Sequence, residues 1–166
     1  PKLSLYGASK AKAEELVCAS GLDWAIVRPP AVYGPGDRET LELFKAARLG
    51  IMPLPPAGRV SLIHVDDLSR LLLALAEPAA PARLVLEPDD GKDGGYTHKE
   101  FARLLATAQD RRALTLSVPA PIMRLGARLD RLLRRDKAKL TPDRAAYFCH
   151  PDWVVDAARR PPAGLW

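Results

Sequence analysis

A tyrosine and a lysine stand four residues apart near the start of the chain, where Tyr6 and Lys10 enclose the tripeptide Gly-Ala-Ser. An apolar-periodic stretch begins here, so we expect a helix over residues 5–20 that ends at Gly21. Residues i and i+4 lie on one face of a helix. A phenol beside an ammonium forms a compact proton-transfer unit, because the cation favours the ionised phenolate. The pattern is common by chance, so its meaning depends on the rest of the chain.

Two further motifs follow it. Residues 27–36 read Val-Arg-Pro-Pro-Ala-Val-Tyr-Gly-Pro-Gly, and residues 62–68 read Leu-Ile-His-Val-Asp-Asp-Leu. Short apolar segments at residues 24–27 and 60–63 are expected to be buried strands that lead into these motifs. The paired prolines end the first strand, because proline cannot donate a hydrogen bond to a neighbouring strand.

The three motifs, in this order from Tyr6 to roughly Glu77, resemble the second half of an extended short-chain dehydrogenase/reductase, the NAD-dependent epimerase/dehydratase family. This resemblance implies that Tyr6 is the proton donor and acceptor at the substrate hydroxyl or carbonyl. It implies that Lys10 binds the nicotinamide ribose and keeps Tyr6 partly ionised. The implied cofactor is NAD or NADP, and the implied catalytic residues are Tyr6 and Lys10.

The resemblance also assigns the second motif. Pro29, Pro30, Ala31 and Val32 resemble the segment whose backbone meets the nicotinamide carboxamide, where the prolines form a rigid wall. Tyr33 then begins the turn into the substrate domain and is a candidate substrate-binding residue.

Arg59 is the second candidate for substrate binding. Sugar-nucleotide epimerases of this family usually carry an arginine four residues before the histidine of the third motif, where it grips a diphosphate. Here that position is Val60, and Arg59 faces the other side of an extended strand. The departure favours a substrate without a diphosphate, or no turnover at all.

The third motif is interpreted as architectural rather than catalytic. Adjacent carboxylates point in different directions on a helix, so Asp66 and Asp67 do not form an acid/base pair. We expect one of these acids to cap the following helix, His64 to be a hydrogen-bonded structural residue, and no metal site.

The sequence lacks the strand, glycine-rich turn and helix that hold a dinucleotide pyrophosphate in this family. The chain also begins at Pro1. We therefore expect it to be the C-terminal half of a longer protein, whose preceding half carries the family's catalytic Ser or Thr. On this view the chain alone binds dinucleotide weakly and is inactive.

Helices and strands alternate, which predicts an α/β protein with a parallel sheet. We expect helices over residues 40–49, 65–77, 97–108 and 121–135 and from about 141, strands at 84–86 and 114–118, and loops at 53–58 and 88–95. A capping box of Thr97 and Glu100 marks one helix start.

By the resemblance, residues 1–37 are the remnant of a Rossmann-type doubly wound parallel sheet, and residues 38–166 form a smaller α/β substrate domain with the C-terminal helices. The strand at residues 24–27 is expected to lack the neighbours that would flank it. Residues 1–30 should therefore pair with a second copy or with another piece of the protein.

Composition fits a globular, cytoplasmic protein, since 48% of residues are hydrophobic, 27% are charged, and no apolar run approaches the roughly 20 residues of a membrane span. Cys18 and Cys149 are expected to be reduced thiols.

Helix 121–135 is basic and amphipathic. We favour a solvated helix packed on the substrate domain over a membrane-surface or partner helix, and we expect no nucleic-acid binding because aromatic stacking residues are absent.

These observations lead to one main interpretation. The intact protein is expected to transfer a hydride to or from a carbon of a small-molecule substrate that bears a hydroxyl or carbonyl, as a reductase or within an epimerase or dehydratase cycle. A homo-oligomer is compatible with this. The alternative is a non-catalytic NAD(P)H-binding structural or assembly protein, resembling the complex I accessory subunit. A redox-sensing regulator is the third option.

Overall fold

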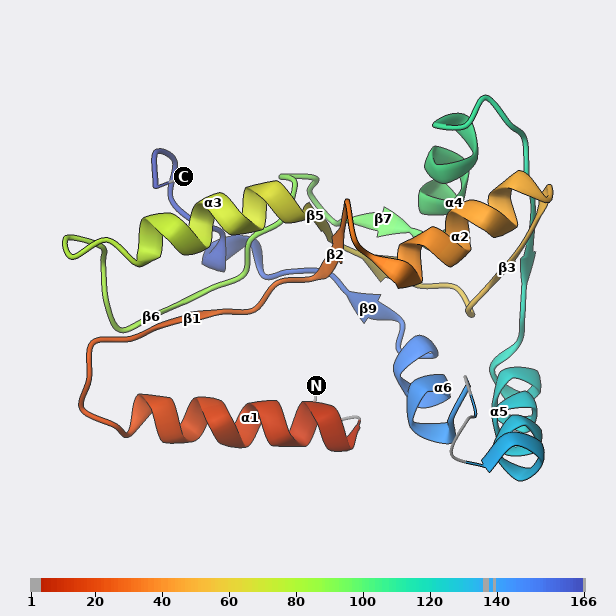
Figure 1. Ribbon diagram of the computed structural model, residues 1–166, viewed down its shortest axis with the longest axis horizontal. Coiled ribbons are helices and arrows are strands. Elements are labelled where there is room, and N and C mark those ends of the chain that lie inside the picture. The colour runs from red at the N-terminus through yellow and green to blue at the C-terminus, as the bar shows by residue number, and fades with distance from the viewer. Residues whose placement is uncertain (1–3, 136–137, 139, 166) are drawn as a thin grey trace.

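The computed structural model describes residues 4–135, 138 and 140–165. Its helices are α1 (Leu5–Cys18), α2 (Arg38–Arg48), α3 (Val65–Leu75), α4 (His98–Thr107), α5 (Ala120–Arg134), α6 (Pro142–Phe148) and a 3-10 turn (Ala157–Arg159). Its strands are β1 (Ala25–Val27), β2 (Ala31–Tyr33), β3 (Ile51–Leu54), β4 (Arg59–Val60), β5 (Leu62–His64), β6 (Leu84–Leu86), β7 (Tyr96–Thr97), β8 (Leu114–Ser117) and β9 (Asp152–Trp153). Helices alternate with short strands, as expected for an α/β fold (Figure 1).

Parallel pairs dominate the described sheets. β1 pairs with β6, β2 with β5, β3 with β8, and β4 with β9, all in parallel, while β4 and β7 are antiparallel. The expectation that β1 lacks neighbours in this chain is wrong, because Ala25 pairs with Leu84 and Val27 with Leu86. The strand at residues 84–86 was predicted from the sequence, but its pairing across nearly 60 residues depends on tertiary structure.

Two other segments differ from expectation. Residues 51–54 form the strand β3, although residues 53 and 54 were expected to lie in a loop. Met52 and Leu54 are buried in this strand, and Pro53 is exposed. Proline is tolerated here because β3 has only β8 as a described partner and is an edge strand. The expected strand at residues 60–63 is divided into β4 and β5 at Ser61, whose backbone N–H donates to Trp153 O.

The largest described hydrophobic cluster lies between α2, β3 and α4. It consists of Ala47, Met52, Leu54, Ala102, Leu105 and Ala106. The predicted capping box begins α4: Thr97 Oγ1 accepts from Glu100 N at 3.1 Å, and Glu100 Oε2 accepts from Thr97 N at 2.7 Å. This cap and the buried face of α4 fix the helix against the β3–β8 pair.

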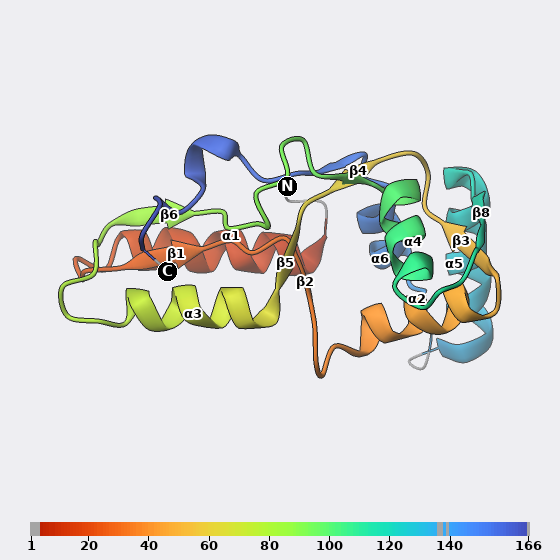
Figure 2. The ribbon, with the colours of Figure 1, turned by 90° about the horizontal axis from the view of Figure 1, so that it is seen from above.

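The C-terminal segment crosses the molecule from α6 back to β6 (Figure 2). A buried ion pair holds it: Arg160 Nε and an Nη donate to the two oxygens of Asp89 at 2.8 and 3.1 Å. The Asp89 side chain is 1% exposed, and Ser61 Oγ also donates to it at 3.2 Å. Asp89 and Asp93 together raise the pKa of Arg160 above its ordinary value through their hydrogen bonds.

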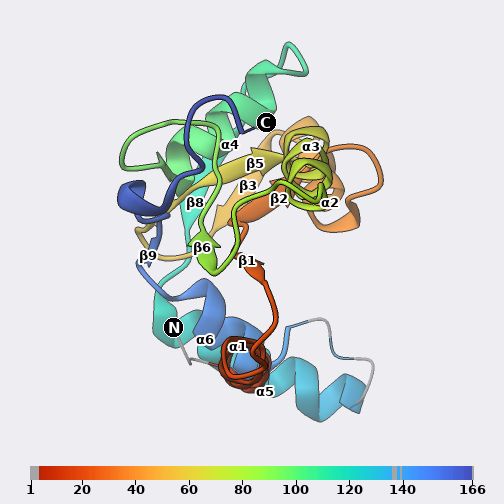
Figure 3. The ribbon, with the colours of Figure 1, turned by 90° about the vertical axis from the view of Figure 1, so that its left-hand side faces the viewer.

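Helix α1 lies apart from these contacts, below the strands when the molecule is viewed along its long axis (Figure 3). None of its described residues is buried, and Leu5 and Leu16 are 85% and 63% exposed. Arg28 bridges α1 to the sheet by donating to Glu14 at 2.6 Å and to Glu87 at 3.2 Å. The Arg28 guanidinium lowers the pKa of Glu14 below its ordinary value through that hydrogen bond. A polar bridge therefore connects this helix to the sheet.

Cys18 and Cys149 are free thiols, as expected. Among the described residues, no helix combines the length and the apolar character needed to cross a membrane.

Replacing Arg160 by methionine tests the ion pair of the C-terminal segment. The variant leaves the buried Asp89 carboxylate without its cation, and we expect the free energy of unfolding to fall by about 3 kcal/mol. Urea denaturation followed by circular dichroism measures the change. Asp93→Asn is the matched control, because Asp93 bonds the same arginine but its side chain is 90% exposed. Equal losses in the two variants would contradict the dominant role of the buried pair.

Candidate active site

The tyrosine and lysine of the first motif lie on adjacent turns of α1, as their spacing predicted. Ser4 caps the helix, with its Oγ accepting from Gly7 N at 3.0 Å. Lys10 Nζ lies 5.7 Å from the centre of the Tyr6 ring, and Tyr6 is 66% exposed. Within the described part of the chain, neither the Tyr6 hydroxyl nor the Lys10 ammonium has a hydrogen-bond partner. Both polar groups are therefore open to a ligand.

The second motif lies at the end of the β2–β5 pair. Pro29 and Pro30 precede β2, and Ala31 and Val32 form its first two residues, with Ala31 N donating to Ser61 O at 3.3 Å. The first turn of α1 lies level with β2 along the long axis of the molecule (Figures 1 and 2). Among the described residues, no hydrogen bond or ion pair joins the first turn of α1 to these four residues, so their shared role at a cofactor stays a prediction.

Tyr33 ends β2 opposite His64, the last residue of β5. Their rings meet edge to face with centroids 5.2 Å apart. Burial, with smaller contributions from Asp90 and Asp67, raises the pKa of Tyr33 above its ordinary value. The Tyr33 hydroxyl is therefore kept protonated at neutral pH and can serve as a hydrogen-bond donor to a ligand.

Glycine is required directly after Tyr33. Gly34 has a φ of 137°, and a Cβ there would lie 2.7 Å from Val65 Cγ1 and 3.0 Å from His64 Nε2. This close approach packs the turn against the start of α3. Gly34 therefore fixes the position of the turn that directly follows Tyr33.

His64 is structural, as expected, but its role corrects one detail. Its Nδ1 accepts from Asp66 N at 3.2 Å, so the histidine rather than an acid caps α3. The two acids occupy the first turn, where carboxylates are favoured, and Asp67 forms an ion pair with Arg70. A histidine preceding a helix can cap it because an imidazole nitrogen accepts a hydrogen bond. The sequence prediction considered only the two neighbouring acids as caps.

Sequence reasoning missed a polar cluster beside Tyr33. Tyr96 donates its hydroxyl proton to Asp90 Oδ2 at 2.5 Å, and Lys92 Nζ lies 4.7 Å from the centre of the Tyr96 ring. This hydrogen bond, with burial and the charge of Asp90, raises the pKa of Tyr96 to about 12. Asp90 also acts on Tyr33, so one carboxylate influences two phenols. The signal in the sequence was the acidic, glycine-containing loop that precedes Tyr96.

Arg59 binds its own chain. Its Nε donates to Gly94 O, and an Nη donates to Gly95 O at 3.0 Å. Gly95 has a positive φ, and a Cβ there would lie 2.7 Å from Val60 O. The guanidinium therefore holds the polar loop against β4. Its assignment to substrate binding stays a prediction.

The Tyr96 hydrogen bond predicts an alkaline titration. Because the bond holds the protonated phenol, its stabilising effect is complete below pH 10 and is lost as the pH rises through about 12. We expect tyrosinate absorbance to show one group titrating near 12, and Tyr96→Phe to remove that component. Tyr147→Phe should leave it in place. Titration of all tyrosines near pH 10 would contradict the assignment.

Comparisons with known proteins agree with this arrangement. The sequence is 37% identical over 163 residues to a ceramide reductase of Caulobacter vibrioides, covering 95% of this chain and 51% of the relative. It is 32% identical over 123 residues to a UDP-glucose 4-epimerase of Vibrio cholerae, covering 69% of this chain and 37% of that protein. No protein-family model matches the sequence.

Solved structures share the fold. MoeE5 in complex with UDP-glucose and NAD superimposes with a TM-score of 0.60 at 26% identity, over 74% of this chain and 44% of that one. The human epimerase family protein SDR39U1 with NADPH superimposes with a TM-score of 0.58 at 20% identity, over 79% of this chain and 39% of that one. The chain spans about half the length of the ceramide reductase and less of the others. The α/β, Rossmann-type prediction is confirmed, and the chain resembles part of the NAD-dependent epimerases and reductases of the extended short-chain dehydrogenase/reductase family.

Proposed function

We propose that the intact protein is an NAD(P)-dependent oxidoreductase that reduces a carbonyl, or oxidises the corresponding hydroxyl, with Tyr6 as its proton donor and acceptor. The observation that carries the proposal is the exposed Tyr6–Lys10 pair, with Lys10 Nζ 5.7 Å from the ring centre and both polar groups open to a ligand. Identity of 37% to a ceramide reductase over 95% of the chain supports it.

The residues present would serve the nicotinamide riboside end of a dinucleotide, whereas the glycine-rich turn for its pyrophosphate does not occur in this sequence. When bound, the nicotinamide supplies or accepts the hydride. Lys10 would donate hydrogen bonds to the ribose hydroxyls and orient Tyr6, whose hydroxyl would give a proton to the substrate oxygen during reduction and take one during oxidation. Pro29, Pro30, Ala31 and Val32 would border the nicotinamide. Two successive prolines leave a rigid edge whose first two residues have no backbone N–H.

Arg59 supports a substrate without a diphosphate. Its guanidinium bonds the carbonyl oxygens of Gly94 and Gly95, so gripping a diphosphate would require it to abandon the loop that it holds. The similarity to a ceramide reductase points the same way, toward a carbonyl on a long-chain lipid amide. Tyr33, a protonated donor beside β2, is proposed to contact the polar part of such a substrate.

Divided roles for Tyr6 and Lys10 predict different kinetic effects in the intact protein. Tyr6→Phe should lower kcat by roughly 10²–10⁴-fold and leave cofactor affinity nearly unchanged, because only the proton transfer is lost. Lys10→Met should lower kcat and also weaken cofactor binding, because the contact with the ribose is lost as well. Steady-state reduction of a long-chain lipid amide that bears a ketone, together with NADH and NADPH fluorescence titrations, measures the two effects.

Lys12→Met is the matched control, because Lys12 lies on the same helix in an exposed pair with Glu15. It should leave both measurements unchanged. Equal turnover by wild type and Tyr6→Phe would contradict the proposal. Tight cofactor binding without turnover of any carbonyl substrate would favour the non-catalytic alternative, and epimerisation of UDP-glucose would contradict the proposed substrate class.

A further inference from the structure

Helix α5 presents its large apolar side chains to solvent. Five leucines and isoleucines lie along it, each between 49% and 81% exposed: Ile122, Leu125, Leu129, Leu132 and Leu133. We call them the leucine stripe. The sequence predicted a solvated amphipathic helix packed on the substrate domain. The described structure packs α5 against α6 and leaves these large apolar side chains exposed.

The helix is attached through its small residues instead. Successive residues turn by about 100°, so the stripe spans roughly 100° of the circumference and its centre lies about 180° from Ala127. Ala127 is the only residue of α5 that is buried in the described structure, at 0% exposure, and α5 packs against α6. The leucine stripe therefore lies opposite the buried side of α5, and Leu132 at its edge borders the hollow beside α6.

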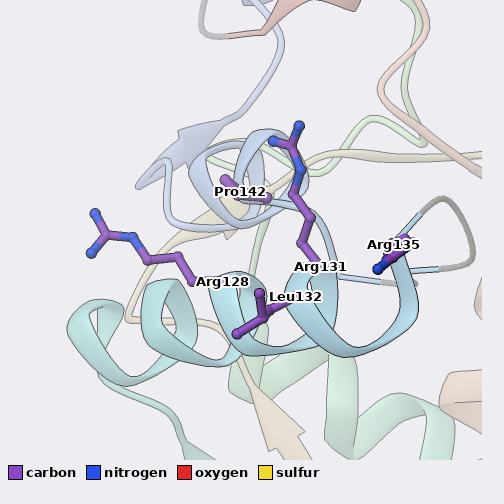
Figure 4. Close-up of a pocket in the computed structure, with 5 residues that line it drawn as sticks. All are labelled: Arg128, Arg131, Leu132, Arg135 and Pro142. Carbon is purple, nitrogen blue, oxygen red and sulfur yellow. The ribbon is translucent and has the colours of Figure 1, made fainter.

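Arginines flank the stripe on one side. Arg124, Arg128 and Arg131 fall within roughly 60° of one another on the helix, and Arg135 follows its last residue. Three of them, with Leu132 and Pro142, border a shallow hollow of about 460 Å³ between α5 and α6 (Figure 4).

The one acid of α5 does not offset this charge, because Asp130 already pairs with Arg134 at 3.3 Å and accepts from Leu140 N at 2.8 Å. No carboxylate pairs with the four flanking arginines within the described part of the chain. The flank is therefore an uncompensated positive surface beside an apolar one.

We propose that α5 lies in the surface of an anionic lipid bilayer, with the leucine stripe among the acyl chains and the flanking arginines at the lipid phosphates. A basic amphipathic helix with an exposed leucine face has the composition of an interfacial helix. The hollow beside Arg128 and Arg131 would receive a phosphate-bearing headgroup. This inference stands on α5 alone and does not depend on the proposed reaction.

Two features favour a bilayer over a protein partner. In a two-fold dimer with antiparallel α5 helices, the arginine flanks of the two copies would lie on the same side without counter-charge. The stripe also consists of flexible aliphatic side chains only, without the aromatic anchors that are enriched in protein interfaces. A fluid apolar phase edged by phosphates matches both the stripe and its flank.

Vesicle co-sedimentation of the protein at its full natural length tests the proposal. Wild type should bind vesicles of 70:30 phosphatidylcholine and phosphatidylglycerol, and should bind pure phosphatidylcholine at least tenfold more weakly. Leu132→Glu/Leu133→Glu should lower binding to anionic vesicles by tenfold or more. Arg128→Gln/Arg131→Gln should lower it by roughly tenfold or more at low salt, because each basic residue near an anionic surface contributes about fivefold.

Matched controls come from other helices. Leu72→Glu/Leu73→Glu changes two exposed leucines of α3, and Arg48→Gln/Arg103→Gln removes two exposed arginines of α2 and α4. Both should bind vesicles as wild type does.

Three results would overturn the proposal. The first is absence of binding to anionic vesicles, or equal binding by the α5 leucine variant. The second is a wild-type dimer, seen by analytical ultracentrifugation, that the leucine variant converts to monomer, which would assign the stripe to a second copy. The third is a fall of several degrees in the melting temperature of the leucine variant but not of its α3 control, which would show that another part of the same protein covers the stripe.

Discussion

The buried carboxylate of Asp89 is the constraint on which the middle of this structure depends. A charge in that position must be paired and hydrogen-bonded, and the chain meets the requirement from distant segments, with Arg160 supplying the cation and Ser61 a hydroxyl. Ser61 Oγ also accepts from Val155 N, which joins the returning C-terminal segment to the break between β4 and β5. The loop after Asp89 is thereby fixed, and with it the polar cluster beside Tyr33.

The first helix is attached by a different kind of interaction. Helix α1, which carries Tyr6, buries none of its described residues. Among the described side chains, Arg28 connects it to the β1–β6 pair by bonding both Glu14 and Glu87. Arg28 directly precedes Pro29, so the same few residues connect the proposed proton donor to the proposed nicotinamide wall. Partly exposed ion pairs are weak and screened by salt, which makes this the least constrained part of the candidate site.

The polar loop is held by Arg59, the arginine that was a candidate for substrate binding. In this chain an arginine next to the diphosphate-binding position has turned to hold Gly94 and Gly95, and the loop in turn presents Asp90 and Tyr96 near Tyr33. Two phenols and a carboxylate therefore gather at the end of β2.

The sequence by itself determined the local elements and the identity of the chemical groups. Helix α1 with Tyr6 and Lys10 on one face, the capping box at Thr97 and the class of fold all follow from spacing and short-range hydrogen bonding, which neighbouring residues decide. Only the tertiary structure decided that β1 pairs with β6 and that Arg59 binds a loop some 35 residues away. It also decided that α5 turns alanine inward and leucine outward. These outcomes depend on which distant surfaces meet, and no periodic pattern within a single element contains that information.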